Sequence, residues 1–158
     1  MPAHSLLPKH DPPTLWERIR FHTSDLWLYL MAIALGLIVI ITPIVAGIPG
    51  SVALASMQLW LSLALSCAII TGGLISIIGL LWVGDTESHG WTLEISGCWL
   101  MAASWAGYAF AVWEKYPASG VVWGFAFLMA LAILTRAAVV MWIEFVRRRE
   151  EGKEGLLS

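Results

Sequence analysis

Residues 121–146 read VVWGFAFLMALAILTRAAVVMWIEFV, an almost uninterrupted apolar run of 26 residues. Its only charged side chains are those of Arg136 and Glu144. A helix needs about 20 mostly apolar residues to cross the hydrocarbon core of a bilayer, which is roughly 30 Å thick. The stretch is long enough, so we expect it to span a membrane as one helix.

The composition of the whole chain agrees with that expectation. Of its 158 residues, 59% are hydrophobic and only 13% are charged. A soluble domain carries roughly 45–50% apolar and about 25% charged residues. We therefore exclude a soluble globular domain, a disordered chain and a disulfide scaffold. The net charge of −2 also argues against a nucleic-acid partner, because few cations are present to neutralise phosphates.

Three more stretches are long and apolar enough to cross a bilayer. Short connections between them force neighbouring helices to run antiparallel. We predict an all-α integral membrane protein, an up-and-down bundle of four transmembrane helices within residues 26–146. The predicted spans are about 26–45, 59–83, 93–113 and 121–146.

The two ends of the chain are predicted to lie outside the membrane. Residues 1–25 form an N-terminal segment, in which Thr14 and Glu17 have the spacing of a helix-capping box. We expect a short amphipathic helix near residues 14–22 on the membrane surface, although an irregular linker remains an alternative. Residues 147–158 form a basic and then acidic tail, whose Arg147, Arg148 and Arg149 meet lipid headgroups.

Lysine and arginine set the expected orientation, because they accumulate on the cytoplasmic side. Of the nine such residues, all but Lys115 and Arg136 lie in the two tails. Both termini are therefore predicted to be cytoplasmic. Tryptophan prefers the membrane–water boundary, and seven tryptophans stand where the predicted spans begin or end. These expected interface anchors are Trp27, Trp60, Trp82, Trp91, Trp113, Trp123 and Trp142.

Two charges stand inside the predicted spans. Arg136 lies about 9 Å inside the inner boundary marked by Trp142, and Glu94 lies about 4.5 Å inside the boundary marked by Trp91. A charge within the membrane costs about 2.5–3.5 kcal/mol on insertion scales, so we expect Glu94 and Arg136 to form an ion pair. The pair either fixes the register of two helices or belongs to an ion or proton path.

Small side chains recur along three of the predicted spans. Such residues let membrane helices approach closely, either within one bundle or between subunits. The candidate helix-packing residues are Ala64, Ala68, Gly72, Ser76, Ala103, Gly107, Ala111, Gly120 and Gly124.

Residues for catalysis or for binding a cofactor are not evident. Cys67 and Cys98 lie at different predicted depths, so we expect no disulfide and interpret both as small apolar filler. Neither a metal-binding spacing nor a nucleophile or nucleotide motif is present in the sequence. We therefore predict a non-enzymatic protein without metal or cofactor.

The region from Glu94 to Arg149 resembles small four-span membrane proteins of actinobacterial phages, some of which are holins. The likeness is carried by Glu94, Gly97, Tyr108, Arg136 and the closing Arg147–Arg149 run. It covers about a third of the chain. The resemblance implies a self-associating protein of the bacterial inner membrane whose oligomers permeabilise the bilayer.

Two other functions fit the same sequence. The chain could be a structural or accessory subunit, or an exclusion factor, that docks on a larger membrane complex. It could instead be a small transporter or channel that uses Glu94 and Arg136. The expected partners are thus the lipid bilayer and either further copies of the chain or a larger membrane complex.

Overall fold

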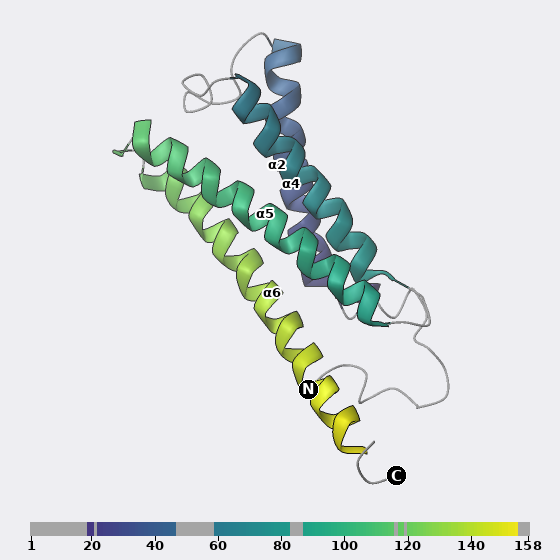
Figure 1. Ribbon diagram of the computed structural model, residues 1–158. Helices are drawn as coiled ribbons and strands as arrows, with labels where there is room; N and C mark the ends of the chain where they lie inside the picture. The colour runs from purple at the N-terminus through teal and green to yellow at the C-terminus, as the bar shows by residue number, and fades with distance from the viewer. Residues whose placement is uncertain are drawn as a thin grey trace.

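The computed structural model describes residues 19–20, 22–46, 59–82, 87–115, 117–118 and 120–154. They form four long helices, shown in Figure 1. The helices are α2 (Thr23–Ala46), α4 (Leu59–Leu80), α5 (Glu87–Lys115) and α6 (Gly120–Glu154).

Each of these helices is long and apolar enough to cross a membrane. The candidate spans run over Thr23–Thr42, Trp60–Leu80, His89–Lys115 and Gly120–Val146. The prediction of an all-helical integral membrane protein with four spans is confirmed as far as the number, length and apolar composition of the helices. The third helix starts earlier than the predicted span at residue 93, because α5 begins at Glu87. The connection between α4 and α5 is therefore shorter than the one predicted between residues 83 and 93. The predicted tail after residue 146 is likewise helical as far as Glu154.

Local hydrogen bonds join the first turn of α2 to the residues that precede it. The Thr23 hydroxyl donates to the carbonyl oxygens of Ile19 and Arg20, and the Leu26 amide donates to the His22 carbonyl. Asp25 lies in the first turn, where the positive end of the helix dipole favours a carboxylate. Most of the amphipathic helix predicted near residues 14–22 lies outside the described residues, which there include only 19, 20 and 22.

Consecutive helices run in opposite directions, and each packs against the next in the order α2, α4, α5, α6 (Figure 1). The molecule therefore has two ends. We call the end where α2 and α5 begin the Asp25 end. The end where α4 and α6 begin is the Val121 end.

Glycines allow α4 and α5 to approach most closely. A methyl group added to Gly72 would lie 2.8 Å from the Gly97 carbonyl oxygen and 2.8 Å from the Met101 side chain. One added to Gly79 would lie 2.6 Å from the Gly90 carbonyl oxygen, and one added to Gly97 would overlap Gly72 and Ser76. Close backbone contact of this kind is how helices pack in a membrane, where no hydrophobic effect drives them together.

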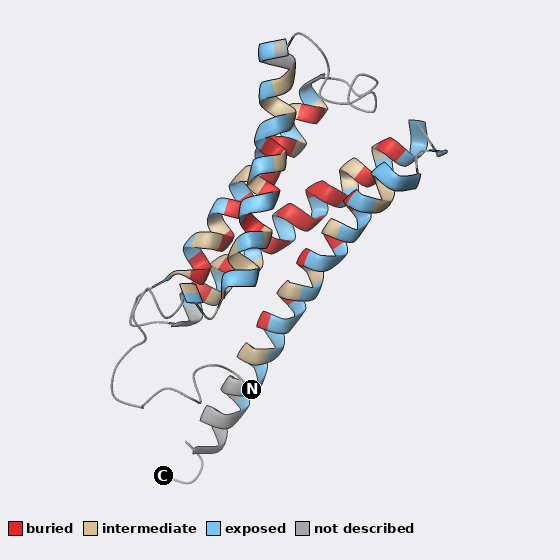
Figure 2. Cartoon of the chain, turned by 180° about the vertical axis from the view of Figure 1, so that it is seen from behind, coloured by how far each residue is buried: buried red, intermediate tan, exposed pale blue. Residues whose placement is uncertain are grey.

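The contact between α6 and α5 uses a different set of small residues. The buried face of α6 recurs every three or four positions, which is the spacing of one helix face. It consists of Ala126, Ala130, Ile133, Ala137 and Val140. Figure 2 shows that buried residues in general lie where the helices face one another, with exposed residues on the outer side. Large apolar side chains such as Trp142 and Phe145 are exposed there, as lipid-facing residues are expected to be.

Candidate functional site: a charged cluster between the four helices

Arg136 stands near the middle of α6 and points toward the neighbouring helices. Its Nη2 atom lies 2.8 Å from Glu94 Oε1 on α5, and its Nε atom donates to the same oxygen at 2.9 Å. Nη2 also lies 3.2 Å from Asp25 Oδ2 on α2. The guanidinium therefore contacts two carboxylates from two different helices. The side chain of Arg136 is only 15% exposed.

Glu94 accepts hydrogen bonds from two helices. Besides both contacts from Arg136, its Oε1 accepts a hydrogen bond of 2.8 Å from the Tyr29 hydroxyl of α2. The Glu94 side chain is 3% exposed, and Tyr29 is fully buried. A buried carboxylate is tolerated when it is paired and hydrogen-bonded, and here both conditions are met.

Two further side chains complete this site. The Tyr29 hydroxyl lies 3.4 Å from Cys98 Sγ, and the Ser76 hydroxyl lies 3.8 Å from the same sulfur. Ser76 also donates to the backbone carbonyl of Glu94 at 3.3 Å. All four helices thus contribute to one site, which we call the Arg136 cluster. Its members are Asp25, Tyr29, Ser76, Glu94, Cys98 and Arg136.

The cluster reaches the surface through α2. Asp25 Oδ2 lies 3.3 Å from His22 Nδ1, and the His22 side chain is 34% exposed. Exposure falls from His22 through Asp25, at 20%, to Glu94, at 3%. His22, Asp25, Arg136 and Glu94 therefore form a short continuous series from the Asp25 end into the interior.

The structure brings together Glu94 and Arg136, which the sequence analysis expected to pair. It also adds Asp25 and Tyr29, which that analysis did not select. Asp25 and Tyr29 are four residues apart and so share one helix face, as do Glu94 and Cys98, but this spacing alone does not single them out. Cys98 is more than apolar filler, since its sulfur contacts two hydroxyls. Both cysteines are free, and Cys67 is exposed.

Some of the predicted helix-packing residues lie between helices of the subunit, and others do not. Gly72 and Ser76 lie in the contact between α4 and α5, and a methyl on Gly107 would meet Leu65 at 3.4 Å. Ala68 and Ala111 are half-buried, while Ala64 and Ala103 are exposed. A methyl group on Gly120 or Gly124 would meet nothing within 4 Å. Packing of α6 within the subunit therefore uses its alanines, and not the two glycines predicted for it.

The predicted membrane anchors lie mainly on the outer surface. Trp27, Trp60, Trp82, Trp113 and Trp142 are exposed, and Trp91 and Trp123 are half-buried.

The expected headgroup contacts lie at the far end of α6. Arg149 is exposed there, whereas the side chains of Arg147 and Arg148 lie outside the described part of the chain. Their predicted contact with lipid headgroups remains a prediction.

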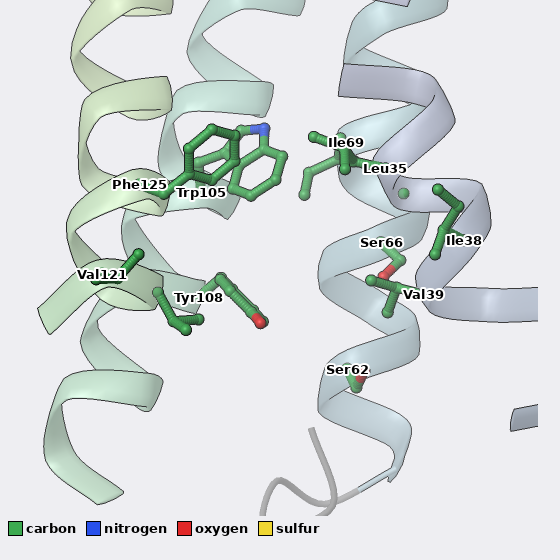
Figure 3. Close-up of a pocket in the computed structure, with 12 residues that line it drawn as sticks. Leu35, Ile38, Val39, Ser62, Ser66, Ile69, Trp105, Tyr108, Val121 and Phe125 are labelled. Carbon is green, nitrogen blue, oxygen red and sulfur yellow. The ribbon is translucent and has the colours of Figure 1, made fainter. Parts of the chain in front are cut away.

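A cavity of about 410 Å³ lies toward the Val121 end (Figure 3). One wall comes from α2 and α4, with Val39 and Ser66, and the other from α5 and α6, with Trp105 and Phe125. The two hairpins, α2–α4 and α5–α6, are thus joined near the Asp25 end by the Arg136–Asp25 ion pair and the Tyr29–Glu94 hydrogen bond, and are separated by a cavity toward the other end.

Within the described residues, no group of three or more His, Cys, Asp or Glu side chains could hold a metal ion. Comparison with known protein families, with curated protein sequences and with solved structures finds no match.

Proposed function

We propose that the chain is a non-enzymatic, holin-like membrane protein that associates with copies of itself and permeabilises the bacterial inner membrane. Both termini are proposed to be cytoplasmic, as the distribution of Lys and Arg favours. The Arg136 cluster then lies in the cytoplasmic half of the membrane, where it holds the four helices of one subunit together.

The observation that carries self-association is the unused glycine surface of α6. The close-approach glycines of α4 and α5 are already in contact within the subunit, as the overlap at Gly72 and Gly97 indicates. Gly120 and Gly124 have the GxxxG spacing, yet an added methyl on either meets no atom within 4 Å. A helix from another subunit could therefore approach the α6 backbone closely at this point.

The proposal is tested by inducible expression in a bacterium while membrane potential is followed with a voltage-sensitive dye. The full chain should abolish the potential, and crosslinking in native membranes should give a ladder of multimers. The double change Gly120→Leu/Gly124→Leu should suppress both effects, because leucine keeps backbones apart. Ala132→Leu is the matched control, since Ala132 is an exposed small residue elsewhere on α6.

A chain that accumulates to high level with no loss of potential contradicts permeabilisation. That result would favour the accessory subunit or exclusion factor, which docks on a membrane complex without opening the bilayer. A double leucine variant that still forms multimers would show that α6 is not the surface of association.

A second candidate function is a small transporter or channel. It is favoured by the position of the charges relative to the cavity, because the two hairpins meet at the Arg136 cluster and part toward the Val121 end. Hairpins in contact at one end and parted at the other are one arrangement expected of a transporter whose two halves move against each other. Ion-selective flux in proteoliposomes, lost in Arg136→Gln, would support this function, whereas unselective leakage supports the holin-like one.

A further inference from the structure

We draw no further inference here: the strongest candidate, the half-open apolar groove between the two hairpins toward the Val121 end, is lined by described residues of all four helices, but nothing in the structure shows what covers it.

Discussion

Arg136 Nη2 lies 2.8 Å from Glu94 Oε1, although the two residues are 42 positions apart in the sequence. This contact joins α6 to α5, and the same guanidinium joins α6 to α2 through Asp25. One cation therefore serves two carboxylates. Removing the cation leaves Glu94 with only the Tyr29 hydroxyl and Asp25 with only His22, whereas removing one carboxylate leaves the cation with the other.

That asymmetry predicts different effects for the two single changes. Arg136→Gln should lower the free energy of unfolding more than Glu94→Gln does, and the difference between the two variants should be about 1–3 kcal/mol. The reason is that a charge without its partner costs about 2.5–3.5 kcal/mol at the centre of a membrane helix on insertion scales. The double variant should recover only part of the loss, since Asp25 has lost Arg136 and keeps only its contact with His22. Adding Asp25→Asn should recover more. The loss in the single variants and the recovery in the combined variants are measured by thermal unfolding in detergent and by accumulation in membranes. Strict additivity of the changes would show that these groups do not interact.

Tyr29→Phe removes one hydrogen bond to Glu94 while keeping the buried ring. We expect it to lower the free energy of unfolding by about 0.5–1.5 kcal/mol, the usual net contribution of such a bond. Tyr108→Phe is the matched control, because Tyr108 lies outside the Arg136 cluster, at the cavity. Equal destabilisation by the two changes would mean that the Tyr29–Glu94 bond contributes nothing specific to stability.

Gly72→Leu should disrupt the subunit itself. A methyl group at this position already lies 2.8 Å from both the Gly97 carbonyl oxygen and Met101, so leucine forces α4 away from α5. Overpacking of this kind costs about 1–3 kcal/mol or more. Circular dichroism during heating should show a lower Tm, whereas Ala64→Leu, at an exposed position of α4, should leave it unchanged. Lost multimers with a normal Tm would instead place Gly72 between subunits.

The proposed orientation is tested by labelling single cysteines in whole cells. With Cys67 and Cys98 replaced by serine, a cysteine introduced as Ser158→Cys should react with an impermeant maleimide only after the membrane is opened. Lys115→Cys should react in intact cells, because Lys115 is the last residue of α5, at the Val121 end, and α6 runs from that end to Glu154 on the other side. Labelling of the Ser158 position in intact cells would reverse the orientation inferred from the basic residues.

The span assignments were within reach of the sequence because they depend on local properties. Length and apolar composition of a single segment decide whether a helix can cross the hydrocarbon, and neither requires knowledge of a neighbour. Glu94 and Arg136 were detectable for the same reason, since a charge inside an apolar run is conspicuous and needs a partner. Asp25 was not selected, because it stands next to the predicted boundary at Leu26, where a charge is unremarkable.

The faces on which the helices meet were decided only in the tertiary structure. In a soluble helix the apolar stripe marks the buried side, but in a membrane helix the lipid-facing side is apolar as well. The sequence pattern of α6 therefore did not distinguish Ala126, Ala130 and Ala137, which are buried, from Gly120 and Gly124, which are not packed. Contacts such as Tyr29 with Glu94, 65 positions apart, depend on the rotation and register of whole helices.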